Sequence, residues 1–137
     1  MPLWEQGAKF AARKMPKVIN PTTHAVLDYV VAGSFLIKAA LMWKRHRRAA
    51  AASLLCGGAT LANAMVTDYP GGVWRKISYR THGRNDSALA GFTAASPGLL
   101  GFKDDDEAGF FRFEALAETA VIGLTDFEYY EGKELAA

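Results

Sequence analysis

Cysteine is almost absent from this chain of 137 residues, which has only Cys56. A single cysteine excludes a disulfide framework and a CxxC zinc or redox motif. The sequence also lacks a glycine-rich phosphate loop, a GxSxG elbow and an HExxH helix, so the common signatures of nucleotide binding, serine hydrolysis and zinc proteolysis are missing. With 50% hydrophobic residues, 22% charged residues and a net charge of +2, the chain can still fill the core of one folded domain.

Charge is distributed unevenly, and long stretches of the chain have little or none. Residues 49–67 contain no charged side chain, and this run matches the roughly 20 residues that a helix needs to cross a bilayer. Residues 25–43 contain two charged side chains, and further apolar stretches follow at 87–102 and 108–127. We therefore predict an all-α bundle of four transmembrane helices. The alternative, a soluble four-helix bundle, would have to bury the helix at 49–67 on every side, because that helix has no charged face.

An internal repeat with an offset of 58 residues runs through the chain, so that residue 24, for example, corresponds to residue 82. A Thr-His-x3-Asp motif at residues 23–28 recurs at 81–86, and a Thr-Asp-aromatic motif at 67–69 recurs at 125–127. Two motifs in the same register predict the duplication of a helical hairpin. Because each hairpin crosses the membrane twice, both begin on the same side, and we expect a pseudo-two-fold axis along the membrane normal.

The repeat divides the single membrane domain into segments. They are an amphipathic N-terminal segment at residues 1–20, hairpin repeat 1 at 21–70, a basic linker at 71–80, hairpin repeat 2 at 81–128 and a C-terminal tail at 129–137. The N-terminal segment lacks the apolar core of a signal peptide and is expected to lie at the membrane interface. The first helix is expected to start at a cap formed by Thr22 or Thr23.

The duplication gathers six ionisable side chains at the end of the bundle that carries both termini: His24, Asp28, Asp68, His82, Asp86 and Asp126. Within each Thr-His-x3-Asp motif the imidazole and the carboxylate lie on one helix face. Imidazole with carboxylates from adjacent helices suits zinc, iron or manganese, so these residues predict one dinuclear or two mononuclear divalent-metal sites. The alternative is a hydrogen-bond network that locks the hairpins together.

Two further interpretations concern the remaining titratable residues and the histidines. A haem or another pigment held by His24 and His82, one from each half, is a second cofactor hypothesis. Glu114 and Glu118 are candidates for a base or a metal ligand, although a polar stripe facing the bundle interior explains them equally. His46, in a basic turn, is interpreted as a solvated side chain.

Residues 95–102 read Ala-Ser-Pro-Gly-Leu-Leu-Gly-Phe, which resembles the SPW repeat of small bacterial membrane proteins. Gly98 stands where that family has its tryptophan. The resemblance implies an integral-membrane fold of repeated two-helix units and brings no catalytic residues with it.

The basic segments predict contacts with lipid. Residues 44–48 and 74–80 lie between predicted spans, so we expect them to bind anionic lipid headgroups and not nucleic acid. Basic residues are more numerous on the side of the termini, which predicts cytoplasmic termini in a bacterial cytoplasmic membrane. Small residues in the helices permit close packing in a homo-oligomer or a larger complex. We expect a non-catalytic scaffold, binding or accessory subunit, with a metal-dependent membrane hydrolase as the alternative.

Overall fold

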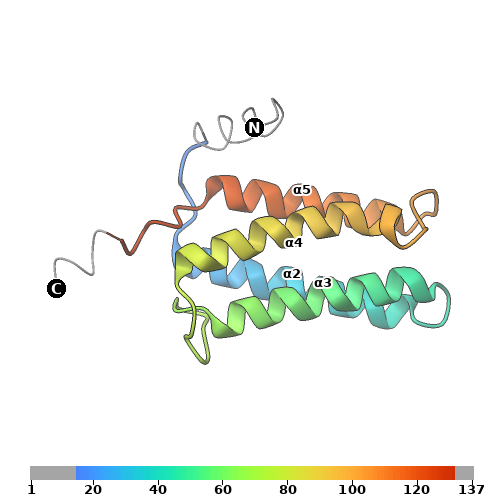
Figure 1. Cartoon of the computed structure of the whole chain (residues 1–137), viewed down its shortest axis with the longest axis horizontal. Coiled ribbons are helices and arrows are strands. Elements are labelled where there is room, and N and C mark those ends of the chain that lie inside the picture. The colour runs from blue at the N-terminus through green and yellow to red at the C-terminus, as the bar shows by residue number, and fades with distance from the viewer. Residues whose placement is uncertain (1–14, 132–137) are drawn as a thin grey trace.

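The computed structural model describes residues 15–131, which form four helices and no strand. The helices are α2 (Pro21–Met42), α3 (Arg47–Val66), α4 (Tyr79–Leu99) and α5 (Ala108–Leu124). Figure 1 shows two antiparallel hairpins, α2–α3 and α4–α5, lying side by side. The predicted all-α class is confirmed for these residues. Most of the predicted N-terminal segment, residues 1–14, and the end of the tail, residues 132–137, lie outside the described residues.

Both hairpins begin with a helix cap at equivalent positions. The side-chain oxygen of Asn20 accepts a hydrogen bond from the Thr23 amide at 2.8 Å, and Ser78 Oγ accepts one from the Thr81 amide at 3.1 Å. These caps satisfy amide groups of the first helical turn. The first cap is Asn20 and not Thr22 or Thr23, because Pro21, whose φ angle is fixed near helical values, occupies the first helical position.

The start of α4 lies before the apolar stretch of that helix. The uncharged run begins at residue 87, whereas the helix begins at Tyr79 and includes the polar segment 80–86. The absence of charge marks the apolar part of a helix, but polar residues after a good cap continue the same backbone hydrogen bonding. As a result the second Thr-His-x3-Asp motif lies entirely within α4, as the first lies within α2.

The backbone confirms that the two halves correspond. Isolated parallel bridges join Ile19 to Thr125 and Thr67 to Ile77. The amide of Ile19 donates to the Leu124 carbonyl, and the amide of Ile77 donates to the Val66 carbonyl, both at 3.0 Å. Each residue of one bridge is 58 positions from its counterpart in the other, since 19 corresponds to 77 and 67 to 125. The segment that precedes each hairpin therefore pairs with the end of the other hairpin.

Small residues fill the interior, and large apolar residues cover the outside. Most of the buried hydrophobic residues are alanines, from Ala25 in α2 to Ala115 in α5. Large side chains are exposed on all four helices: Val26, Val30, Ile37, Leu41, Leu54, Leu55, Phe92, Leu99, Phe113 and Leu116. Among the described helices, α2 and α3 are the two that are long and apolar enough to cross a membrane. In α4 the first two turns are polar, and α5 has only 17 residues.

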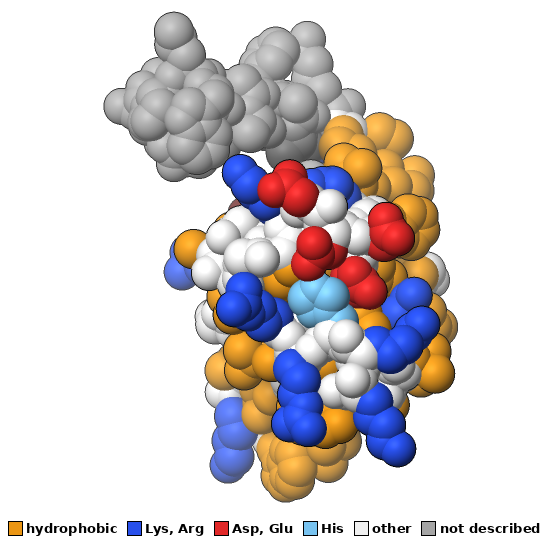
Figure 2. Space-filling model, turned by 90° about the vertical axis from the view of Figure 1, so that its right-hand side faces the viewer, with side chains coloured by type: hydrophobic (Ala, Val, Ile, Leu, Met, Phe, Trp, Pro, Cys, Tyr) orange, Lys and Arg blue, Asp and Glu red, His pale blue; other side chains and the backbone are white. Residues whose placement is uncertain are grey.

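One end of the bundle, which we call the loop end, carries the α2–α3 and α4–α5 connections. Figure 2 views this end and shows Lys, Arg, Asp and Glu side chains gathered around an imidazole, with hydrophobic side chains along the flanks. Beneath the loops Phe35, Phe102 and Phe111 pack together in the largest apolar core of the described chain. The opposite end, where α2 and α4 begin, is called the site end below.

Candidate functional site

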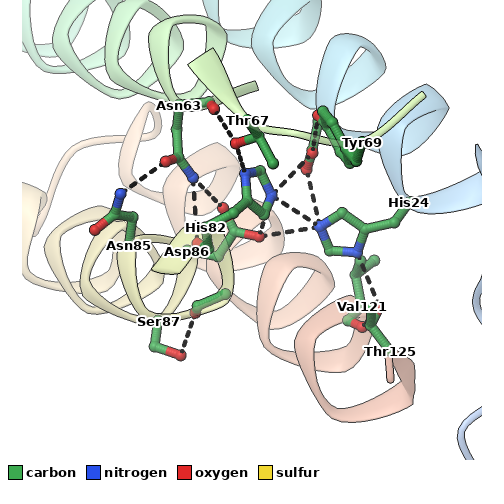
Figure 3. Close-up of polar contacts among 12 residues, drawn as sticks. His24, Asn63, Thr67, Tyr69, His82, Asn85, Asp86, Ser87, Val121 and Thr125 are labelled. Carbon is green, nitrogen blue, oxygen red and sulfur yellow. Dashed lines mark hydrogen bonds and ion pairs between the residues drawn. The ribbon is translucent and has the colours of Figure 1, made fainter. Parts of the chain in front are cut away.

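Four side chains converge at the site end, one histidine and one aspartate from each repeat. The Nε2 atoms of His24 and His82 are 3.2 Å apart, and the two imidazoles point toward each other (Figure 3). Asp86 Oδ2 lies 3.0 Å from each of these nitrogens. Asp28 approaches the same two atoms, with Oδ1 3.3 Å from His24 Nε2 and Oδ2 3.1 Å from His82 Nε2. These four residues, His24, Asp28, His82 and Asp86, form the His/Asp cluster.

A threonine fixes the proton position on each imidazole. Thr67 Oγ1 lies 2.8 Å from His82 Nδ1 and donates its only proton to the Asn63 carbonyl at 2.5 Å. The hydroxyl must therefore accept at its contact with the imidazole, so Nδ1 of His82 carries a proton. In the neutral imidazole the lone pair is then on Nε2, which faces the cluster.

The same arrangement recurs at the other histidine. Thr125 Oγ1 lies 2.9 Å from His24 Nδ1 and donates to the Val121 carbonyl at 2.6 Å. Each threonine thus orients the histidine of the opposite repeat, because Thr125 belongs to the second repeat and His24 to the first. Hydrogen bonds of this kind to the outer nitrogen are typical of metal-bound histidines.

Hydrogen bonds also orient the two carboxylates. The Tyr69 hydroxyl donates to Asp28 Oδ2 at 2.7 Å, and Asn63 Nδ2 donates to Asp86 Oδ1 at 2.9 Å. Asn63 is itself held by Asn85, whose amide donates to Asn63 Oδ1 at 2.8 Å. Burial and the negative charge of Asp28 raise the pKa of Tyr69 far above its usual range, so this phenol keeps its proton and remains a donor.

Aromatic rings cover the cluster toward the site end. The ring of Phe127 lies 5.1 Å from that of His24, and the ring of Tyr69 lies 5.1 Å from that of His82, measured between centroids. Tyr79 packs edge-on against His24 at 5.7 Å. His24 and His82 are fully buried as a result. The rings lower the local dielectric constant, which strengthens every electrostatic interaction within the cluster.

The geometry fits a single divalent metal ion. Five donor pairs within the cluster are separated by 3.0–3.3 Å. Two ligands that bind one ion at about 2.0–2.2 Å, with an angle of about 90–110° between them, lie at such a separation. Two nitrogen lone pairs and two carboxylates facing one buried point also create a strongly negative potential that a cation neutralises. A haem does not fit, because nitrogens 3.2 Å apart with carboxylates beside them leave no space for a macrocycle.

Two of the six predicted residues lie outside the cluster. Asp68 is exposed, with Oδ1 3.5 Å from Arg75 Nη1, and Asp126 Oδ1 accepts a hydrogen bond from the Glu128 amide at 3.0 Å. Backbone geometry explains this, because Thr67 and Thr125 are extended residues that end α3 and α5. Successive side chains of an extended chain point to opposite sides. The threonine points into the bundle, and the aspartate after it therefore points outward.

Thr67 and Thr125 are the site residues that the sequence analysis did not identify, because it looked for residue types that bind metal ions directly. The signal for them was present in the sequence, because Thr67 and Thr125 recur at the same offset as the aspartates beside them. Glu114, a further candidate, accepts a hydrogen bond from Ser34 Oγ at 2.9 Å and so joins α5 to α2. Glu118 lines a cavity next to the cluster together with Asp28 and Asp86.

His46 at the loop end provides an internal contrast to the two cluster histidines. Its Nδ1 accepts a hydrogen bond from the Ala49 amide at 3.2 Å, so it caps α3. The neutral ring therefore carries its proton on Nε2, which donates to Asp105 Oδ2 at 2.7 Å. His46 is thus a capping residue that links the two loops, and not a solvated side chain. Although Asp105 and Glu107 stand near it, no lone pair of the neutral ring faces them.

Comparison with known protein families, with curated proteins and with solved structures finds no match to this chain. The resemblance of residues 95–102 to the SPW repeat stays a prediction.

Proposed function

We propose that this protein is an integral membrane protein that binds one divalent transition-metal ion in the His/Asp cluster. The observation that carries the proposal is the pair of Nε2 atoms 3.2 Å apart, with oxygens of both aspartates 3.0–3.3 Å from them. Two imidazole nitrogens and two carboxylates are a ligand set for zinc, manganese or iron. Four protein ligands around one ion match a structural or storage site more closely than a catalytic one, which keeps a position open for water. A non-catalytic function is therefore favoured over hydrolysis.

The distribution of residue sizes supports a membrane location. Alanines lie inside the bundle, and large apolar side chains such as Ile37, Leu54 and Leu116 are exposed. This is the arrangement expected where lipid surrounds the helices and small residues let them approach closely. Since α4 and α5 are the repeat counterparts of α2 and α3, we propose that all four helices cross the bilayer. The cluster then lies near one membrane surface, and the basic residues of the sequence favour the cytoplasmic one.

Metal analysis of the purified protein tests the proposal. We expect inductively coupled plasma mass spectrometry of the detergent-purified chain to find one zinc, manganese or iron ion per chain. His46→Ala is the matched control, because it removes the only other histidine and should leave the metal content unchanged. If neither the purified protein nor protein dialysed against each metal retained a stoichiometric ion, the proposal would be wrong. The cluster would then be a protonated hydrogen-bond network that locks the hairpins.

Removal of a threonine hydroxyl should weaken metal binding without removing a ligand. Thr67→Val keeps the shape of the side chain but leaves His82 Nδ1 without an acceptor, so we expect a loss of about 10–100-fold in metal affinity. Thr67→Ser retains the hydroxyl and should retain most of the affinity. Competition with a fluorescent chelator measures both variants. Equal affinities for the two variants would show that the threonine does not orient the histidine.

A further inference from the structure

A groove opens at the loop end, between the end of α2 and the start of α5. These two helices pack less closely against each other than α3 and α4 do. The groove has a volume of about 400 Å³. Its lining includes two cations, two carboxylates and two aromatic rings: Lys38, Arg45, Asp106, Glu107, Phe110 and Phe113. We call it the loop-end groove.

The four charged side chains of the groove do not pair with one another. Within residues 15–131 neither of the two cations forms an ion pair. The Lys38 ammonium lies over the ring of Phe110, 5.2 Å from its centroid. Asp106 also has no ion pair in this part of the chain, and Glu107 Oε2 is 4.0 Å from His46 Nε2. Because all four groups are exposed or half-buried, they are accessible to a bound molecule.

The repeat shows that this combination of charges belongs to one side of the bundle. The counterparts of the two carboxylates, 58 residues earlier, are Arg48 and Ala49. The counterpart of Phe110 is Ala52, and both alanines are fully buried. The equivalent contact between α3 and α4 therefore lacks both carboxylates and the aromatic ring. Duplication of a hairpin does not account for the loop-end groove.

The groove spans the boundary between the charged loops and the apolar flank of the bundle. Arg45 and Asp106 belong to the loops, whereas Phe113 lies further along α5 and is 67% exposed. Figure 2 shows the same boundary, with cations and carboxylates together at the loop end and hydrophobic side chains on the flanks. In a bilayer this boundary lies at the level of the lipid headgroups. The groove thus suits a molecule with a charged part near the loops and an apolar part along Phe113.

We propose that the loop-end groove binds the headgroup of one ethanolamine phospholipid. The phosphate would pair with Lys38 and Arg45, and the ammonium would pair with Asp106 and Glu107. Hydrogen bonds between charged groups of this kind are stronger than those between neutral groups. The inference rests on the proposed membrane location and does not require a metal ion.

The charges of the groove distinguish ethanolamine from other headgroups. Phosphatidylglycerol would bring an anionic headgroup next to two carboxylates, without an ammonium to pair with them. The quaternary ammonium of choline has no N–H donor and is recognised by the faces of aromatic rings. In this groove the Lys38 ammonium already covers the ring of Phe110. An ethanolamine ammonium, like that of lysine, has three N–H donors for the carboxylates.

Native mass spectrometry of the detergent-purified chain tests the inference. The probe is an equimolar mixture of dioleoyl phosphatidylethanolamine, phosphatidylglycerol and phosphatidylcholine. We expect one phosphatidylethanolamine per chain to be retained about tenfold more often than either other lipid, because each of these lacks a pairing between charged groups. Equal retention of the three lipids would overturn the inference.

Variants of the acidic loop test the ammonium contact. Asp106→Asn combined with Glu107→Gln should abolish the preference for phosphatidylethanolamine over phosphatidylglycerol. The side chain of Glu107 makes no capping hydrogen bond to α5, so the helix start should persist. Asp104→Asn is the matched control, because Asp104 lies in the same loop but outside the groove. A preference that persisted in the double variant would overturn the inference.

Variants of the cations test the phosphate contact, and two further measurements separate the groove from the proposed function. Lys38→Gln combined with Arg45→Gln should lower the retention of phosphatidylethanolamine about tenfold, whereas Lys44→Gln, outside the groove, should not. Metal content of the same samples tests the His/Asp cluster. A chain that stays in solution without detergent would contradict the membrane location. A chain that needs detergent but retains the three lipids equally would contradict the groove alone.

Discussion

Replacement of either cluster histidine by alanine should abolish stoichiometric metal binding. We expect His24→Ala and His82→Ala each to lower metal affinity by more than about 100-fold, because each removes a direct ligand and loss of an outer hydrogen bond alone costs 10–100-fold. Each variant also leaves the buried Asp28 and the partly buried Asp86 without one of their partners. Metal content per chain and chelator competition measure the loss.

A thermal measurement provides a second readout for these variants. In the wild-type protein a chelator should lower the midpoint of unfolding, because an ion at about 100 times its dissociation constant stabilises the folded state by about 2.7 kcal/mol. In His82→Ala the chelator should have no effect. His46→Ala, which leaves the cluster intact, should behave as the wild type. A His82→Ala variant that still binds one ion at wild-type affinity would place the metal elsewhere in the chain.

Phe35→Ala should cause the largest loss of stability at a position away from the cluster. The side chain is fully buried and contacts the rings of Phe110 and Phe111, with centroids 5.4 and 6.1 Å away. Truncation of a buried phenylalanine leaves a cavity and costs about 3–5 kcal/mol. Equilibrium unfolding in mixed detergent micelles measures the free energy of unfolding. The metal content of the folded fraction should remain unchanged, because Phe35 lies near the loop end.

Phe113→Ala is the matched control for that measurement. Phe113 lies on α5 beside Phe111 and Glu114 in sequence, but its side chain is 67% exposed. In a bundle surrounded by lipid or detergent its removal should change the free energy of unfolding by less than about 0.5 kcal/mol. A loss as large as that of Phe35→Ala would mean that the exposed apolar faces are packed against protein, and it would contradict the proposed contact of these faces with lipid.

The repeat made most of the architecture predictable from the sequence. Apolar runs with few or no charges located the four helices, and the shared offset indicated that both histidines and the first aspartate of each half come to one end. The helix starts were less predictable, because hydropathy locates the apolar part of a helix and not its cap. Asn20 and Ser78 show this, since both lie outside the apolar runs and yet start α2 and α4.

The preferences of metal ions for particular ligands could not show which of two neighbouring residues, Thr67 or Asp68, points into the bundle. Thr67 and Asp68 are repeated equally, and a carboxylate is the better metal ligand, so the sequence favoured Asp68. The extended backbone after α3 decides otherwise by directing Thr67 inward. The difference between the two contacts that join the hairpins was equally hidden. A duplication predicts equivalent contacts, whereas α3 packs against α4 more closely than α5 packs against α2.

The crossed pairing of threonines and histidines makes each half of the chain depend on the other. Thr125 supports His24 and Thr67 supports His82, and the bridges of Ile19 and Ile77 also join one half to the other. A single hairpin could not complete these interactions by itself, whereas two identical hairpins around a two-fold axis could. Neither half of the chain is therefore expected to assemble the His/Asp cluster on its own.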